Sequence, residues 1–367
     1  MKIFQTNHLP GRTVQTSDGS EYLWFSGTDY LGMGHDESFR SYLQEGIDAY
    51  GLHFGASRNN SLRLDIYEEA ELHLANWIGT PTSLLISSGM WAGQLVMKCI
   101  ENIVHFTSST SSVQYHYAPK AHPAIWGNNL KISGDHWIDW AYQVIDEIIH
   151  SSTNTAHVIC TDAIGSPMVE AFDFSVFANL PSGRNIWIVV DASHTLGVHK
   201  TFGKDIYQLI EGSGKANVIM VSSLNKALGI PGGVIACERS TYDLLHNAPW
   251  FAGASPPAPG YIYALSKLLE TNRFANVHTM LSANIDYFNQ KLIAQDLFVC
   301  APGYPVFCSR NPLLFDHLLG EQIMTSCFSY PSANDTPVTR IAISAIHQKE
   351  DLNRLAEVCN SFKSSFL

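Results

Sequence analysis

The sequence predicts an α/β fold built on a seven-stranded, mainly parallel sheet with helices on both faces. Between residues 83 and 237, short apolar runs alternate with longer stretches of helical pattern, as in consecutive β-α-β units. After the proline-rich segment 254–260 the composition changes to long helical stretches followed by short strand-like pieces. That change predicts a second, smaller α+β domain at the C-terminal end.

Each predicted strand is a short apolar run between turn-forming residues. The seven segments are 83–87, 103–107, 130–133, 157–161, 186–190, 218–221 and 234–237. In parallel sheets the ligand binds beyond the carboxyl ends of the strands, where the connecting loops converge. We therefore expect functional residues directly after these segments.

Three regions organise the chain around this sheet. Residues 1–40 have an irregular pattern and predict an N-terminal arm. Residues 41–255 are predicted to form the large domain. Amphipathic helices are predicted over 37–50, across the boundary with the arm, and over 64–78, and Gly79 ends the second helix. Residues 260–367 predict the small domain, with helices over 261–272 and 277–295 and a last helix at the end.

Composition excludes several partners and locations. The formal net charge is −11 and no basic cluster occurs, which argues against nucleic acid and anionic membranes as partners. No run reaches the roughly 18 apolar residues of a membrane span. The seven scattered cysteines predict reduced thiols and a cytoplasmic protein. No C-x-x-C or H-x-x-x-H spacing of the kind that binds zinc occurs, so we expect no structural metal. Only 15% of residues are charged, which predicts a homodimer with substantial buried surface.

Lys226 is the strongest single candidate for chemistry. It lies in a short polar turn between two predicted buried strands, 218–221 and 234–237, and glycines at 229, 232 and 233 allow a tight turn. Desolvation lowers the pKa of a lysine there, and the neutral amine that results can form a Schiff base with a carbonyl.

Asp191 directly follows the apolar segment 186–190, and His194 comes three residues later. Read alone, Asp191 could simply cap the helical segment that follows. Placed together in one pocket, the carboxylate can hold a proton on a heterocyclic nitrogen and the imidazole can bind a neighbouring oxygen. A carboxylate beside a pyridine ring is what pyridoxal-phosphate chemistry requires.

The junction at Gly89 predicts a phosphate site. A strand ends and a helix begins there, so backbone N–H groups are available, and Gly89 allows close approach. The hydroxyl of Ser223, three residues before Lys226, could bind the same phosphate or merely satisfy its own turn.

Six short motifs, in order along the chain, resemble those of the α-oxoamine synthases, which include 8-amino-7-oxononanoate synthase and 2-amino-3-ketobutyrate CoA ligase. They are Thr28-Asp-Tyr-Leu-Gly-Met, Gly55-Ala-Ser-Arg58, Ser87-Ser-Gly-Met-Trp-Ala, His122-Pro-Ala-Ile-Trp, Asp191-Ala-Ser-His-Thr-Leu-Gly and Ser223-Leu-Asn-Lys-Ala-Leu-Gly. The resemblance covers about residues 20–350. It implies a fold-type I pyridoxal-phosphate transferase of aminotransferase class I/II.

The resemblance implies four catalytic residues and one further residue, Ser166, that binds the cofactor. Lys226 would hold pyridoxal 5'-phosphate as a Schiff base, and Asp191 would face the pyridine nitrogen. His122 would stack on the ring, while His194 and Ser166 would lie near the phenolic oxygen.

The remaining matches concern the phosphate and the substrate. Gly89, Met90 and Ser223 would surround the phosphate. Arg340 would bind the carboxylate of the amino-acid substrate, a role that suits a guanidinium fork, and Thr28 would lie nearby. Read without the resemblance, Arg340 could equally be a solvated strand residue.

The implied reaction joins a small amino acid to an acyl-CoA thioester, with loss of CO2, and gives an α-amino ketone. Alternatives are an aminotransferase, a lyase or racemase acting on an amino acid, and a binding protein that kept only the fold. The chain departs from the family at three positions, with Thr28 in place of asparagine, Ala192 in place of glutamate and Gly253 in place of threonine. These departures suggest a divergent or repositioned substrate.

Overall fold

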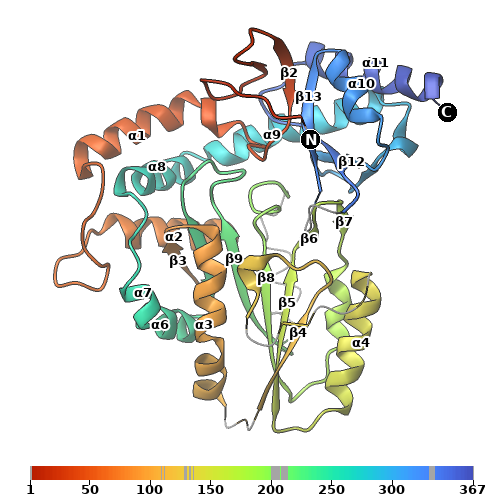
Figure 1. Ribbon diagram of the computed structural model, residues 1–367. Coiled ribbons are helices and arrows are strands. Elements are labelled where there is room, and N and C mark those ends of the chain that lie inside the picture. The colour runs from red at the N-terminus through yellow and green to blue at the C-terminus, as the bar shows by residue number, and fades with distance from the viewer. Residues whose placement is uncertain are drawn as a thin grey trace.

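The computed structural model describes residues 2–366 apart from 109, 111, 128–129, 132–133, 135, 200–206, 208–213 and 330–334. Figure 1 shows a large sheet with flanking helices below and a smaller sheet with its own helices above, and both chain ends lie in the upper part. Within the described residues, every helix is either too short or too polar to span a bilayer.

The large sheet has six strands in the order β3-β10-β9-β8-β5-β4. Their bounds are β3 Thr82–Ile86, β4 Ser112–Tyr117, β5 Thr155–Asp162, β8 Asn185–Asp191, β9 Asn217–Ser223 and β10 Gly233–Cys237. β4, β5, β8 and β9 are parallel, whereas β10 is antiparallel to both of its neighbours. The α/β fold class is confirmed, and five of the predicted strand segments fall on strands of this sheet.

Two predicted strands differ from the structure. Segment 103–107 is the last part of helix α3, Gly89–Thr107, because its apolar residues Ile103 and Val104 continue the buried stripe of that helix. The strand at 130–133 is wrong over Leu130 and Lys131, and the rest of that segment lies outside the described residues. The strand that pairs with β5 at this edge of the sheet is β4 instead. Its tyrosine, histidine and serine residues do not form the apolar run typical of a buried strand. The part of the sheet that the structure describes therefore has six strands rather than seven.

Helices cover the large sheet. They are α1 Glu37–Tyr50, α2 Ile66–Ile78, α3, α4 Trp137–His150, α6 Arg239–His246, α7 Pro249–Ala252 and α8 Pro259–Glu270. α2 ends at Gly79, whose left-handed backbone (φ 82°) and N–H bond to Ala75 O close the last turn. α8 lies after the predicted boundary near residue 260, yet it packs against α1 and α2 of the large domain. The division into domains therefore stays a prediction.

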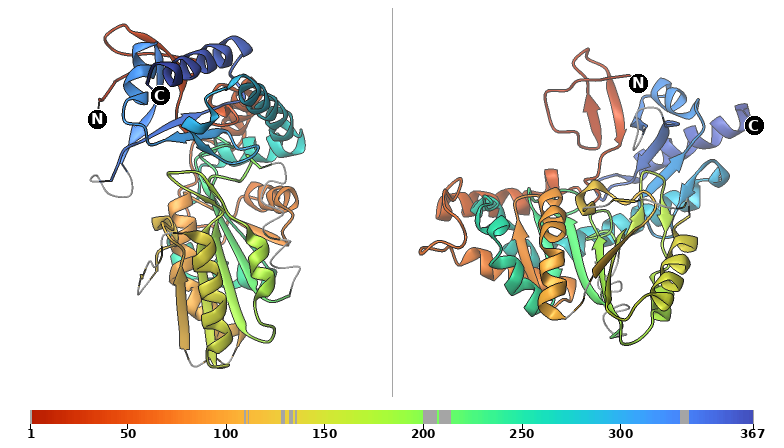
Figure 2. Two further views of the ribbon diagram at one scale, coloured as in Figure 1. Left: turned by 90° about the vertical axis from the view of Figure 1, so that its right-hand side faces the viewer. Right: turned by 60° about the horizontal axis from the view of Figure 1, so that its bottom comes forward.

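The second sheet combines the two ends of the chain. Its order is β1-β2-β13-β14-β12-β11, with bounds β1 Thr13–Gln15, β2 Glu21–Phe25, β11 Val299–Cys300, β12 Val306–Ser309, β13 Ile323–Phe328 and β14 Val338–Ala342. The helices beside it are α9 Arg273–Lys291, α10 Leu314–Gly320 and α11 Lys349–Phe366, and a small hairpin, β6 Ile164–Gly165 with β7 Glu170–Ala171, lies between the sheets. β2 pairs in parallel with β13, so the arm is part of this sheet. Both views in Figure 2 show the arm beside the C-terminal segment.

Ion pairs and hydrogen bonds fasten the arm in place. Arg12 binds both carboxylate oxygens of Asp351, with Nε 2.8 Å from Oδ2. The buried His347 lies 2.9 Å from Trp24 O through Nε2 and accepts Ser344 N–H through Nδ1, also at 2.9 Å. These contacts fix the segment that follows β2, which carries Thr28 and Tyr30.

Candidate active site

Three neighbouring strands place polar residues at one edge of the large sheet. β5 ends at Asp162, β8 at Asp191 and β9 at Ser223, and the strands run parallel. Lys226 lies in the turn that joins β9 to β10. This edge is where parallel sheets bind ligands, so the predicted turn residues Asp191, Ser223 and Lys226 come together there.

Asp162 and Asp191 form a pair of adjacent carboxyl groups. They occupy the same register on β5 and β8. Asp191 is buried and accepts Ser193 N–H at 2.9 Å, whereas Asp162 accepts His122 N–H at 3.0 Å. Burial, followed by the negative charge of Asp191, raises the pKa of Asp162 well above its usual range. One of the two carboxyl groups is therefore readily protonated.

His122 presents a neutral aromatic ring beside Asp191. Its Nδ1 lies 3.6 Å from Asp191 Oδ2 and accepts the N–H of Ala124 at 3.2 Å. Because Nδ1 accepts a hydrogen bond, the ring proton is on Nε2. Burial lowers the pKa of His122, although the charge of Asp191 acts in the opposite direction. The ring is thus uncharged near neutral pH.

Lys226 has the environment expected of a reactive amine. It is half-buried, and burial lowers the pKa of its side chain. The charges of Asp191 and Asp162 raise that pKa, and the charge of Arg340 lowers it. A lowered pKa increases the fraction of neutral amine. These interactions also show that Lys226, both aspartates and Arg340 share one electrostatic environment.

Arg340 is a buried cation without an anionic partner among the described residues. Its side chain on β14 is 8% exposed, and Nε forms no hydrogen bond. The groups that raise its pKa are Tyr30, Tyr304 and Cys308, none of which is a carboxylate. Burying a guanidinium without a counter-ion is unfavourable. This position therefore has the property of an anion-binding site.

Tyr30 connects Arg340 with His194. Its hydroxyl accepts a hydrogen bond from Arg340 Nη2 at 2.6 Å and lies 3.3 Å from His194 Nδ1. Since the oxygen accepts from Arg340, its hydrogen can be donated to Nδ1, which leaves the proton of the imidazole on Nε2. Burial, and then the charges of Lys226, Arg340 and His122, lower the pKa of His194 well below its usual value. His194 is a neutral donor through Nε2.

The first turn of α3 lies against Ser223. A Cβ added to Gly89 would be 2.5 Å from Ser223 Cβ, so only glycine allows this approach. Ser88 caps the helix by accepting Trp91 N–H at 3.1 Å. In the part of the chain that the structure describes, the N–H groups of Gly89 and Met90 have no protein acceptor. Unpaired N–H groups at the start of a 19-residue helix fit a phosphate.

Three predicted residues are less closely tied to this group. Ser166 and Thr28 are half-buried and Met90 is 48% exposed. Among the described residues, no hydrogen bond links their side chains to Lys226, Asp191 or His194. Of the departures, Ala192 is fully buried and Gly253 follows α7.

Sequence reasoning did not select Asp162, Tyr30, Tyr304 and Ser193. Asp162 follows the apolar segment 157–161 just as Asp191 follows 186–190, so the same signal could have found it. Tyr30 lies within the motif that supplied Thr28. Ser193 accepts Ser223 N–H through Oγ at 2.8 Å, and Tyr304 donates to His194 O at 3.0 Å. Those two contacts join distant segments and leave no local pattern.

Comparisons with known proteins agree with this geometry. The family model described as "Aminotransferase class I and II" matches residues 142–358. An 8-amino-7-oxononanoate synthase of Yersinia enterocolitica is 25% identical, covering 95% of this chain and 91% of its own, and one of Aliivibrio fischeri is 26% identical, covering 94% and 89%. The expected resemblance to the α-oxoamine synthases is confirmed.

Solved structures share the fold. A serine palmitoyltransferase of Sphingomonas wittichii superposes with a TM-score of 0.78 at 12% identity, over 98% of this chain and 91% of that one. An 8-amino-7-oxononanoate synthase of Francisella tularensis gives 0.64 at 20% identity, over 94% and 99%. The match to the family model spans more than half of the sequence, and the chain belongs to the aminotransferase class I and II family.

Proposed function

We propose that the protein is a pyridoxal-phosphate-dependent transferase that condenses a small amino acid with an acyl-CoA thioester. The products are an α-amino ketone, CO2 and free CoA. One observation carries the proposal: in the part of the chain that the structure describes, the buried guanidinium of Arg340 has no carboxylate partner, and it lies within electrostatic range of the Lys226 amine. An amino-acid substrate would supply the missing carboxylate.

The residues present fit the cofactor. The N–H groups at the start of α3, with Gly89 and Ser223 in close approach, suit its phosphate. Asp191 suits its ring nitrogen, His122 its ring face and Lys226 its aldehyde carbon. When bound, pyridoxal phosphate supplies the electron sink that stabilises negative charge at the α-carbon of an amino acid.

Lys226 would act as the base. Its amine, with a pKa lowered by burial, can take the α-proton of the substrate and return it later. The neighbouring carboxylates of Asp191 and Asp162 favour the ammonium that forms. Burial thus favours the neutral amine of Lys226, and the two neighbouring carboxylates favour its ammonium form.

Asp191 and the two histidines would prepare the site for that step. Asp191 would hold a proton at the pyridine nitrogen, since one of its oxygens is already fixed by Ser193 N–H. The neutral ring of His122 can lie flat against another ring without the cost of burying a charge. His194 would donate through Nε2 to the phenolic oxygen, with Ser166 as a second donor.

The acyl-transfer half of the proposal is supported by the relatives. The product named in 8-amino-7-oxononanoate has its amino group on the carbon next to a ketone. Condensing an amino acid with an acyl group, with loss of the carboxylate, gives this arrangement. A serine palmitoyltransferase, whose name also describes acyl transfer to an amino acid, shares the fold.

We also propose a homodimer in the cytoplasm. Leu52 and Leu62 are 73% and 70% exposed, and Trp250 on α7 is 49% exposed. The segment that carries these leucines contacts α7 where Ser57 donates to Ala252 O at 2.7 Å. Large apolar side chains of this kind favour cover by a second subunit. All seven cysteines are free thiols, which favours a reducing compartment. Sedimentation equilibrium tests the dimer.

The decisive experiment follows two reactions of the purified protein loaded with pyridoxal phosphate. Exchange of the α-proton of glycine, alanine or serine in deuterated water reports the base, and release of free thiol on addition of acyl-CoAs reports condensation. We expect both reactions, and Lys226→Ala should reduce each at least about 10³-fold. Oxo-acid formation without any thiol release would instead identify an aminotransferase.

A further inference from the structure

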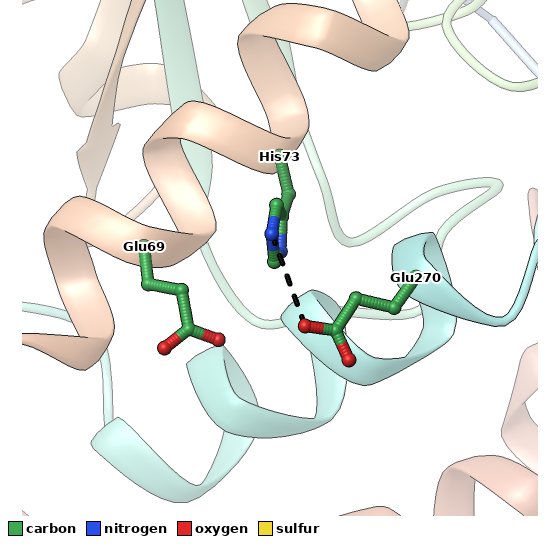
Figure 3. Close-up of side chains that lie close together, drawn as sticks. All are labelled: Glu69, His73 and Glu270. Atoms are coloured by element: carbon green, nitrogen blue, oxygen red, sulfur yellow. Dashed lines mark ion pairs between the residues drawn. The ribbon is translucent and has the colours of Figure 1, made fainter.

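We propose that Glu69, His73 and Glu270 form a divalent-cation site, with zinc as its best-matched ion. Figure 3 shows these side chains, the first two from α2 and the third from α8, directed into the space between the two helices. One ligand atom from each lies within 4.8 Å of the other two. The Glu–His–Glu cluster, as we name these residues, is on the surface and separate from the strand ends that carry Lys226.

A fully buried serine fixes the tautomer of His73. Ser266 is 0% exposed, and its hydroxyl donates to Glu69 Oε1 at 3.0 Å while lying 2.8 Å from His73 Nδ1. A hydroxyl has one hydrogen, and the charged carboxylate is the stronger acceptor. His73 Nδ1 must then donate to Ser266, and the lone pair of the imidazole is on Nε2.

That lone pair faces a carboxylate. His73 Nε2 lies 3.8 Å from Glu270 Oε1, which is longer than a hydrogen bond. Two acceptors that face each other repel, and either a proton on Nε2 or a shared cation removes that repulsion. Two donors about 2.0–2.2 Å from a tetrahedral zinc ion lie roughly 3.4 Å apart, so a small side-chain shift would bring this pair to the spacing of a shared ion.

The remaining contacts complete a metal environment. Glu270 Oε2 binds Lys267 Nζ at 2.8 Å, which leaves Oε1 as the free ligand atom and holds the carboxylate in place. Glu69 and Glu270 are exposed, so small rotations can bring their oxygens to bonding distance. A ligand histidine whose second nitrogen is held by a buried group is the usual arrangement around zinc. One nitrogen and two oxygen ligands leave room for water.

Such an ion would join α2 to α8. The two helices pack together beside α1. Because a cation bound by both helices favours the folded state over the unfolded chain, zinc should raise the melting temperature of the protein.

The test is zinc titration of the full-length holoenzyme against a chromophoric chelator, in a Cys300→Ser background that removes the exposed thiol. We expect one equivalent whose affinity falls at least about tenfold in His73→Gln and in Glu270→Gln. His150→Gln is the matched control, since His150 also faces a carboxylate, Asp146, at 3.4 Å but has no third ligand among the described residues. It should bind zinc as the parent does.

Two further readouts decide the outcome. Zinc should raise the melting temperature of the parent and of His150→Gln but not of His73→Gln, each compared with the same protein in EDTA. Crystals soaked in zinc should give an anomalous peak beside His73 Nε2. Zinc binding that is absent in the parent, or unchanged in both His73→Gln and Glu270→Gln, would overturn the proposal.

Discussion

Arg340 donates a hydrogen bond to the hydroxyl of Tyr30 at 2.6 Å, across 310 residues of sequence. This bond is the only one that the described residues offer to the buried guanidinium, and it joins the N-terminal arm to the C-terminal sheet. Because Tyr30 also faces His194, a single hydroxyl orients both the cation proposed to bind the substrate and a candidate proton donor.

Tyr30→Phe should weaken amino-acid binding and slow turnover together. Loss of a hydrogen bond to a charged group costs on the order of 1.5 kcal/mol, about a tenfold change. We expect KM for the amino acid to rise by about that factor and kcat to fall, as measured by thiol release. Tyr287→Phe, which removes a hydroxyl bonded to Asn353 at 2.9 Å, is the control and should leave both constants unchanged.

Gly89→Ala should impair cofactor binding. The added methyl group would lie 2.5 Å from Ser223 Cβ and would push α3 away from the turn after β9. We expect the Kd for pyridoxal phosphate, measured by absorbance titration, to rise at least about tenfold. Gly320→Ala provides the control, because no atom lies within 4 Å of its added Cβ. Equal affinity in the two variants would contradict the phosphate site.

Asp162→Asn should stabilise the protein while reducing its activity. The folded pKa of Asp162 is above its unfolded value of 3.8, so the native state binds more protons and loses stability as pH rises through that window. An amide keeps the acceptor for His122 N–H without the buried charge. The gain in melting temperature over the parent should be larger at pH 8 than at pH 5. Asp173→Asn is the control: the pKa of Asp173 is lowered by its hydrogen bonds to Ser175, so it should show no such gain.

The free energy of unfolding should fall as the pH is lowered from 6.5 to 4. Burial lowers the pKa of His347 from 6.5 to about 4, so the unfolded chain binds more protons in this range. Each such histidine contributes a slope on the order of 1 kcal/mol per pH unit, and burial lowers the pKa of His116 and His157 to about 4 as well. In urea titrations, His347→Gln should flatten the slope, whereas the exposed His150→Gln should not.

The sequence predicted much of the site because its residues follow strands. Asp191, Ser223 and Lys226 each come after an apolar run. Because parallel strands place their carboxyl ends at one edge of the sheet, such residues lie close together regardless of the length or conformation of the connecting loops. The Gly89 junction could be predicted for the same reason. The turn that carries Lys226 could also be predicted, from the glycines at 229, 232 and 233.

What the sequence could not predict depends on pairing between distant segments. Tyr30 reaches His194 because β2 pairs with β13, and the spacing of apolar residues along the sequence does not show which strands will pair. The error at 103–107 has a local cause, since a buried helix and a buried strand show the same short apolar run. The Glu–His–Glu cluster has no recognisable spacing in the sequence, because Glu270 comes from another helix.

The pairing of β2 with β13 has a consequence for how the protein is made. Residues 21–25 can pair with β1 at once, but they must wait for residues 323–328 before their strand joins the rest of the upper sheet. A growing chain forms its earlier segments first, and the large sheet, whose last described strand ends at Cys237, can assemble before the arm joins the upper sheet. The bond between Tyr30 and Arg340 would then form late in synthesis, and with it the amino-acid binding proposed for Arg340.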